Sequence, residues 1–225
     1  MKAIFAIAAL LRMTPLRPSI WPAALLLAVG SGGCAIAQPS FDCSRADSSA
    51  LEAICASPAL SELDVELSRL YGLAIDGPNL TPDRGNELKA TQRGWIKGRD
   101  ECWKADAGLE PCIAESYSIR IHDLREGYAD ARTDDAAGVS VGPVAVVCDG
   151  LDAGVSAVFV NTAEPMVSLR WLDQSIALPN VQSGSGAKYE GETYAGTATF
   201  WTKGDEALFT PPGGSQLACR IEEIG

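Results

Sequence analysis

The chain has 225 residues, 47% of them hydrophobic, and a formal net charge of −11. Strong acidity argues against nucleic acid or an anionic membrane as a partner, and it favours a basic partner because opposite net charges speed encounter. The chain contains a single histidine, His122, and no recognisable nucleophile motif, so we expect neither an enzyme nor a cofactor.

Residues 1–37 have the pattern of a secretory signal. A basic start is followed by the apolar run Trp21–Val29 and by Ala35-Ile-Ala37, a small-x-small cleavage site. The apolar run is too short for a membrane span. We therefore expect a soluble periplasmic protein that begins at Gln38. Loss of the three basic residues of the signal takes the net charge from −11 to −14.

Cys34 offers an alternative processing route. Ser31-Gly-Gly-Cys34 resembles a lipoprotein cleavage site, and modification there would anchor the protein to a lipid. Such sites usually carry Leu three positions before the cysteine, where this chain has Ser31. The soluble form is therefore preferred, and the lipid-anchored form at Cys34 remains the alternative.

Helical periodicity runs from about residue 41 to 128. Ser49 and Glu52 fit a capping box at the start of a short helix that ends near Cys55. Thr81-Pro82 predicts the start of a later helix, with Pro at its first position. Apolar residues fall on one face of the second helix and of the last helix. They are Leu60, Leu63, Leu67, Leu70, Tyr71 and Ala74, and then Ile113, Tyr117, Ile121, Leu124 and Tyr128.

Several short segments of residues 38–128 resemble the LprI-like domain, a small helical secreted module. They are Phe41-Asp-Cys43, Glu52-Ala-Ile-Cys55, Leu63-Asp64, Tyr71, Gln92-Arg-Gly-Trp95, Arg99-Asp-x-Cys102, Cys112 and Tyr117-x-x-Arg120-Ile121. The resemblance implies a helical fold. The resemblance implies an activity less strongly than a fold, because only some members of the family are linked to lysozyme inhibition.

Six cysteines follow the signal: Cys43, Cys55, Cys102, Cys112, Cys148 and Cys219. An even number in a secreted chain predicts three disulfides. No two of these cysteines have the Cys-x-x-Cys spacing that is typical of a metal site. For the first four we favour the nested pairs Cys43–Cys112 and Cys55–Cys102, because antiparallel helices would bring those ends together. The pairs Cys43–Cys102 and Cys55–Cys112 are the main competitor.

Residues 129–142 lack periodicity and are predicted to be a linker. From residue 143 the apolar period becomes two, in short runs separated by turn residues. The expected strands are Val144–Cys148, Val155–Asn161, Met166–Leu172, Thr197–Trp201, Ala207–Thr210 and Gln216–Ile221. Short strands at this spacing predict a small antiparallel barrel or sandwich over residues 143–225. The expected fold class is therefore α+β, with a helical domain followed by a β domain.

Two segments of this second half resemble the signatures of the MliC/PliC proteins, which inhibit c-type lysozyme. They are Ser183-Gly-Ser-Gly-Ala-Lys-Tyr189 and Phe200-Trp-Thr-Lys-Gly-Asp-Glu-Ala207. In that family the first reads Ser-Gly-x-x-Tyr and the second ends in Trp-x-Lys-Gly. The resemblance implies one β-barrel over about residues 145–221. It also implies a Cys148–Cys219 disulfide, worth about 4 kcal/mol in the chain-entropy model.

The same resemblance implies a lysozyme-binding site. Lys203 occupies the inhibitory position, where its ammonium can pair with the two carboxylates of a lysozyme cleft. Ser185 would donate or accept a hydrogen bond there, and Gly186 and Gly204 shape the two turns. Tyr189 is counted with the site, where we expect it to brace the loop. Ser185 and Lys203 stand 18 positions apart, wider than the family pattern, and the extra residues are expected within 190–196.

The sequence thus predicts a secreted protein that inhibits c-type lysozyme by inserting loop residues of a β-barrel into the active-site cleft. The expected partner is the lysozyme itself, with no nucleic acid, no metal and no cofactor. The alternative is a module of the cell envelope that recognises peptidoglycan fragments or another protein without inhibiting lysozyme.

Overall fold

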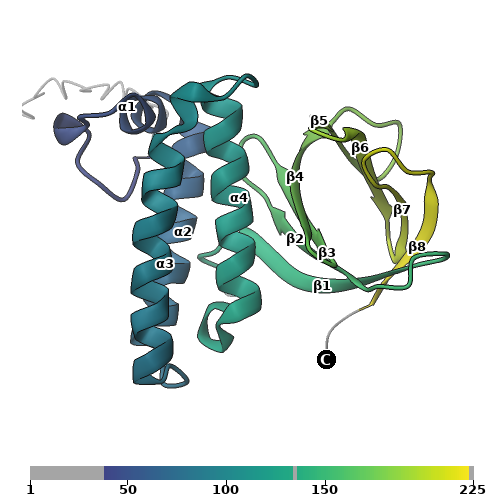
Figure 1. Ribbon diagram of the computed structural model, residues 1–225, viewed down its shortest axis with the longest axis horizontal. Helices are drawn as coiled ribbons and strands as arrows, with labels where there is room; N and C mark the ends of the chain where they lie inside the picture. The colour runs from purple at the N-terminus through teal and green to yellow at the C-terminus, as the bar shows by residue number, and fades with distance from the viewer. Residues whose placement is uncertain (1–37, 134–135, 223–225) are drawn as a thin grey trace, which may run out of the picture. The chain divides into compact units, whose positions relative to one another are not determined.

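The computed structural model describes residues 38–133 and 136–222 (Figure 1). Four α-helices precede eight β-strands, which confirms the α+β layout in two domains. The helices are α1 (Ser49–Ala56), α2 (Pro58–Asp76), α3 (Pro82–Asp100) and α4 (Leu109–Gly127), and three short 3₁₀ turns are η1 (Cys43–Arg45), η2 (Cys102–Lys104) and η3 (Ala129–Ala131). The expected signal, its cleavage site and Cys34 lie outside the described residues.

Polar side chains begin three of the helices. The hydroxyls of Ser48, Ser57 and Thr81 accept hydrogen bonds from backbone N–H groups in the first turns of α1, α2 and α3. Pro follows directly at the start of α2 and α3, where its missing N–H costs nothing. The Thr81-Pro82 prediction is confirmed, but the capping box at Ser49 is wrong by one residue, because Ser48 is the cap.

The core of the helical half comes from the apolar faces of α1, α2 and α4. Leu63, Leu70, Ile113 and Ile121 are each at most 1% exposed. Tyr117 lies among them with its hydroxyl donating to Asp64 Oδ1 over 2.7 Å. No helix of the described residues has both the length and the apolarity needed to span a bilayer.

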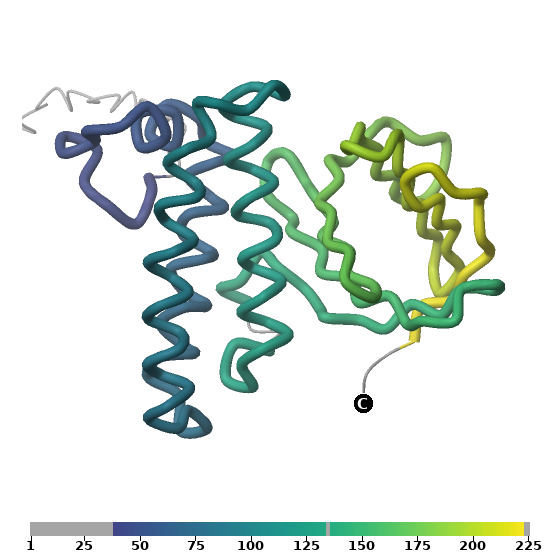
Figure 2. The backbone as a smooth tube through the Cα atoms, viewed as in Figure 1, coloured from purple at the N-terminus to yellow at the C-terminus, as the bar shows by residue number. Residues whose placement is uncertain are grey.

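The eight strands form one closed antiparallel barrel in chain order, and β1 pairs with β8 to complete it. The tube in Figure 2 follows the chain from strand to strand around the barrel. The strands are β1 (Ser140–Cys148), β2 (Val155–Val160), β3 (Met166–Trp171), β4 (Gln174–Val181), β5 (Ala187–Thr193), β6 (Gly196–Lys203), β7 (Glu206–Thr210) and β8 (Leu217–Glu222). Phe200, Phe209 and Leu169 are fully buried inside it.

The sequence predicted six strands, and the structure has eight. Residues 178–180 lie between two of the expected strands, in a stretch where we predicted only turn residues, but they belong to β4. Pro179 is tolerated because it is the last residue paired with β3, and pairing with β5 begins only at Asn180. Strand β5 was also missed, and β1 begins at Ser140, inside the segment expected to be a linker.

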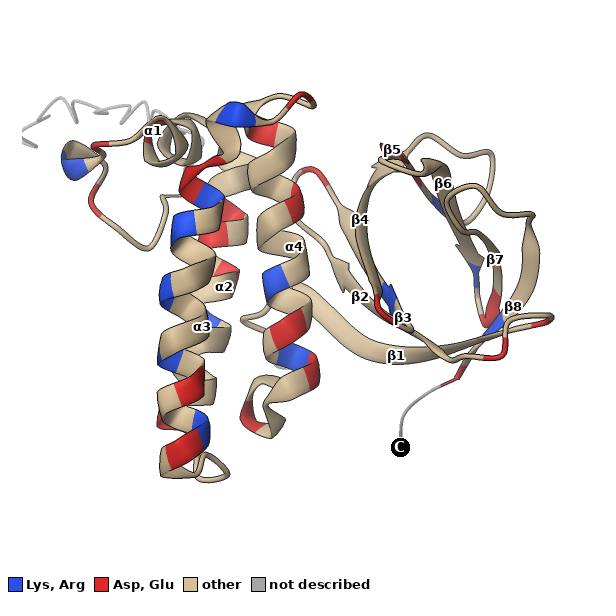
Figure 3. Ribbon diagram, viewed as in Figure 1, with Lys and Arg blue, Asp and Glu red and all other residues tan. Residues whose placement is uncertain are grey.

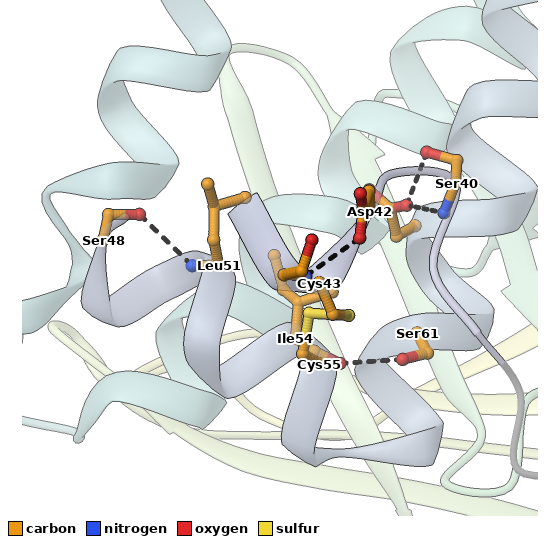
Figure 4. Close-up of a disulfide and its surroundings, with 10 residues drawn as sticks. Ser40, Asp42, Cys43, Ser48, Leu51, Ile54, Cys55 and Ser61 are labelled. Atoms are coloured by element: carbon orange, nitrogen blue, oxygen red, sulfur yellow. Dashed lines mark hydrogen bonds between the residues drawn. A yellow bond between two sulfur atoms is a disulfide. The ribbon is translucent and has the colours of Figure 1, made fainter. Parts of the chain in front are cut away.

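Three disulfides are present, but two of them differ from our expectation. The structure joins Cys43 to Cys55 and Cys102 to Cys112, so both pairings considered above are wrong. Each bridge closes a short local loop next to a helix end rather than linking distant helices; Figure 4 shows Cys43 and Cys55 beside the start of α2. Cys148 pairs with Cys219 across β1 and β8, as the family resemblance implies.

Helix α4 packs against the barrel strands β2 and β3. His122 is fully buried there, with its Nδ1 3.0 Å from Ser168 Oγ and its Nε2 2.9 Å from Ser156 Oγ. Arg170 of β3 forms ion pairs with Asp123 and Glu126 of the same helix. The lone histidine therefore has a structural role at this contact.

The helical core also extends into the barrel strands. Val158 and Val160 of β2 are fully buried and belong to the apolar cluster of the helices. Glu66 of α2 accepts hydrogen bonds from the backbone N–H and the hydroxyl of Ser140, where β1 begins. Its pKa is lowered because hydrogen bonds from Arg69 and Ser140 outweigh the opposing effect of burial. The helical half and the barrel thus share a boundary that contains both buried apolar side chains and hydrogen bonds.

Candidate functional site

The two motif segments meet at one rim of the barrel. The loop of residues 182–186 joins β4 to β5, and Gly204-Asp205 forms the turn between β6 and β7. Ala187 pairs with Thr202, so the first residue of β5 lies beside the last residues of β6. Ser185 and Lys203, predicted from separate motifs, are therefore brought to the same end of the barrel.

Gly186 holds the two segments at close approach. Its φ is +67°, a backbone region that side chains rarely adopt. A Cβ at this position would lie 2.2 Å from the carbonyl oxygen of Thr202 and 3.2 Å from Cβ of Lys203. Only glycine fits here. Gly204 also has positive φ, at +60°, but a Cβ there would meet nothing within 4 Å.

A tryptophan fastens the loop to the neighbouring strand. The indole Nε1 of Trp201 donates to the carbonyl oxygen of Ser185 over 2.8 Å, and the Ser183 hydroxyl donates to the same oxygen over 2.8 Å. The Ser185 side chain stays exposed, and its hydroxyl makes no hydrogen bond within the described residues. Its backbone is therefore fixed while the hydroxyl is left for a partner.

Lys203 has no partner for its ammonium among the residues that the structure describes, and its side chain is exposed. Lys188 differs, because its Nζ lies 2.7 Å from Glu190 Oε2. Lys203 stands opposite Glu206 in the β6–β7 register without forming an ion pair with it. Lys203 thus presents an available cation at the same end of the barrel as the Ser185 hydroxyl.

Tyr189 does not reach this surface. It is 4% exposed, and its ring centroid lies 5.9 Å from that of Phe159 in the barrel core. Burial raises the pKa of its hydroxyl. This packing supports the expected role of Tyr189, which is to brace the loop from inside the barrel.

The wide spacing of the motifs is absorbed at the other end of the hairpin. Strands β5 and β6 pair continuously from Ala187↔Thr202 to Thr193↔Gly196, and the chain turns through Tyr194 and Ala195. The additional residues lengthen the hairpin away from the rim. The separation of 18 positions consequently leaves Ser185 and Lys203 side by side.

A hollow of about 520 Å³ lies on the outer barrel wall next to Trp201. Its charged lining residues are three carboxylates and one guanidinium, those of Asp149, Glu206, Glu222 and Arg220. The wall beside the rim is therefore acidic. The described residues contain no group of three or more side chains suited to hold a metal ion.

The sequence pointed to Lys203 and Ser185 but did not reveal what Trp201 does. Strand alternation was the available signal. Phe200 faces the core, so its neighbour Trp201 must face outward, toward the adjacent loop.

Both halves of the chain match known families. Residues 146–218 match the family described as membrane-bound lysozyme-inhibitor of c-type lysozyme, MliC, and residues 43–135 match the family described as lysozyme inhibitor LprI. The proteins named lipoprotein LprI from Mycobacterium tuberculosis and Mycobacterium bovis are 28% identical to the chain over 181 residues. That alignment covers 75% of this chain and 85% of theirs.

No solved structure matches the chain. The match to lipoproteins and to a family described as membrane-bound supports association with the cell envelope. The four-helix part of the chain thus matches the LprI family model and the closed barrel matches the MliC family model, and both models are described as lysozyme inhibitors.

Proposed function

We propose that the protein is a non-catalytic inhibitor of c-type lysozyme in the periplasm, and that the barrel rim enters the active-site cleft of the enzyme. Lys203 would pair with the cleft carboxylates, and the Ser185 hydroxyl would form a hydrogen bond beside it. Cleavage before Gln38 and a soluble mature form belong to this proposal, with lipid attachment at Cys34 as the alternative.

The observation that carries the proposal is the joining of the two motif segments at one rim. Trp201 and Gly186 fix the loop against β6, so the unpaired ammonium and the free hydroxyl are presented together. Binding then requires little further ordering of the loops, and low ordering cost favours affinity. The acidic wall beside the rim also suits a basic partner.

The electrostatics are adequate for inhibition. A retaining lysozyme works with two carboxyl groups in one cleft. An ammonium at about 4 Å from one carboxylate gains roughly 4 kcal/mol at an effective dielectric near 20. Desolvation of both ions reduces the net value. A net contribution of about 1–3 kcal/mol, typical of hydrogen bonds to charged groups, is what we expect from Lys203.

The test is a titration of a c-type lysozyme with the wild type, Lys203→Ala and Ser185→Ala. Lys203→Ala should raise the inhibition constant by about 5- to 150-fold, since each 1.4 kcal/mol is a factor of ten. Ser185→Ala should cost less, because a neutral hydrogen bond is weaker. Lys203→Glu should cost more than Lys203→Ala, because it adds a carboxylate to a cleft that already holds two.

Lys188→Ala is the matched control, since this lysine lies on the neighbouring strand and is already paired with Glu190. It should leave inhibition nearly unchanged. Unchanged inhibition by a folded Lys203→Ala protein would disprove the mechanism. Absence of inhibition by the wild type, together with binding to peptidoglycan, would favour the envelope-binding alternative.

A further inference from the structure

The helical half contains a groove that the proposed lysozyme contact does not use. It has a volume of about 410 Å³ and lies between the segment before α1, α2 and α3. This size is within the usual range for small-molecule sites. Its lining residues are Ser40, Asp64, Leu67, Ser68, Tyr71, Lys89, Gln92, Arg93, Trp95, Ile96 and Arg99.

The groove is positively charged, unlike the chain as a whole. Three basic side chains and one acidic side chain line it, whereas the chain carries a net charge of −11. Lys89 and Arg93 are four positions apart on α3, and Lys97 follows after one more turn; basic segments recur along this helix in Figure 3. Like charges at this spacing destabilise a helix by about 0.2–0.5 kcal/mol per pair.

Two cations of the groove have no counter-charge among the described residues. Lys89 and Arg93 are exposed and form no ion pair with any described residue. Other basic residues of α3 do have carboxylate partners, as Arg84 does in Glu87 and Arg99 in Asp100. The repulsion between Lys89 and Arg93 is therefore uncompensated, and on an otherwise acidic protein this indicates a site where an anion binds.

The floor of the groove holds a buried arginine in a fixed position. Arg99 is 6% exposed, and it donates to Asp100 Oδ1 through Nε and Nη2 and to the Tyr117 hydroxyl through Nη1. Tyr117 in turn donates to Asp64, whose other oxygen accepts from Ser40. Of the five N–H donors of Arg99, two make no hydrogen bond to a described residue.

One wall of the groove is aromatic and is held rigidly. Trp95 donates from Nε1 to the carbonyl oxygen of Ser116 over 3.1 Å and packs edge-on against Tyr117 at 5.0 Å. Tyr71, Leu67 and Ile96 extend this surface, and Gln92 and Ser68 add polar groups. A ring of mixed polarity can lie on such a wall while its substituents reach the polar groups.

We propose that this groove binds an anionic saccharide of the cell wall, one N-acetylated sugar ring that bears a carboxylate. Arg93, Lys89 and the free N–H groups of Arg99 would hold the carboxylate, a geometry that guanidinium groups favour. The ring would lie against Tyr71 and the part of Trp95 that lines the groove, since the Arg99 guanidinium already lies over the indole, 5.3 Å from its centroid. The groove shares no residue with the barrel rim, and its positive charge would repel a basic lysozyme. The proposal for the groove therefore does not depend on the proposed lysozyme contact.

Isothermal titration of the full mature chain with N-acetylmuramic acid tests the proposal. The neutral N-acetylglucosamine, which has the same ring without the lactyl carboxylate, is the matched ligand. We expect measurable binding of the acid, at least tenfold weaker binding of the neutral sugar, and weaker binding of the acid at high salt. Inorganic phosphate should bind no better than the neutral sugar.

The double variant Lys89→Gln/Arg93→Gln should lose at least tenfold in affinity for N-acetylmuramic acid while it keeps its melting temperature and its effect on lysozyme. Lys97→Gln, on the same helix but outside the groove lining, should bind like the wild type. No binding by the wild type, equal binding of both sugars, tight binding of phosphate alone, or full affinity in the double variant would each overturn the proposal.

Discussion

Gly186 and Gly204 both have a left-handed backbone, but their surroundings differ. Comparison of an alanine substitution at each position therefore separates the cost of backbone strain from the cost of a steric clash. Gly204→Ala should cost about 1 kcal/mol, the strain of that conformation alone. Gly186→Ala adds a clash with the carbonyl of Thr202, so it should lower the melting temperature further and displace Ser185. Thermal melts and lysozyme titration of both variants check this. Equal effects of the two substitutions would contradict the close approach described here.

His122 makes stability depend on pH. Its pKa is lowered from 6.5 to about 4, chiefly by burial and then by Arg170, with Glu126 and Asp123 opposing. In this range the unfolded chain binds more protons than the folded one, so stability falls as pH drops from about 6.5 toward 4. The loss is at most about 3 kcal/mol. Denaturant titration at pH 7 and pH 5 should show it, before most carboxylates titrate.

The control for this effect is His122→Gln, which keeps a polar side chain and removes the titrating ring. The variant should be less stable than the wild type at pH 7, because the hydrogen bonds to Ser168 and Ser156 are disturbed. Its stability should change less between pH 7 and pH 5. An identical pH slope in both proteins would exclude His122 as the source.

Single residues were predictable from sequence where the cause is local. Thr81-Pro82 marks a helix start because capping depends on neighbouring residues. Ser185 and Lys203 come from the resemblance to the MliC/PliC signatures, and their role in binding stays a prediction. The roles of Trp201, Arg99 and His122 depend on partners 16 to 46 positions away, and nothing in the spacing identifies those partners.

At the scale of elements, the disulfides should contribute unequally. The Cys148–Cys219 bridge spans 71 positions and the Cys43–Cys55 bridge spans 12. The chain-entropy model assigns them about 4 and about 3 kcal/mol. Replacing both cysteines of a bridge by Ser should therefore destabilise the chain more in the barrel than in the helices. Denaturant titration measures this, and non-reducing peptide mapping should return the pairs Cys43–Cys55, Cys102–Cys112 and Cys148–Cys219.

The elements that sequence analysis missed have a common cause. Strands β4 and β5 contain Pro179, Gly191 and few large apolar residues, so their alternation is too short and weak to mark a strand in the sequence. They form because closure of the sheet requires them, which is a tertiary effect. The prediction of nested disulfides was wrong for a related reason. We assumed that the cysteines link distant helices, whereas each bridge closes the loop at a helix end.

For the whole molecule, the shared core predicts cooperative unfolding. Val158 and Val160 of the barrel are buried with the helices, and Glu66 binds Ser140 across the boundary. Calorimetry of the mature chain should show one transition, with equal calorimetric and van't Hoff enthalpies. A fragment of residues 140–222 should melt lower, because it exposes both valines. Two separate transitions in the intact chain would show that the boundary is weak.

The disulfide at the barrel seam has a consequence for association. Cys148 and Cys219 face each other where β1 meets β8, the pair of strands that closes the sheet. If reduction lets this seam part, the barrel becomes an open sheet with two long unpaired edges, which can add strands from other copies. The expected consequence of reducing Cys148–Cys219 is therefore edge-to-edge association of copies, which the closed seam prevents.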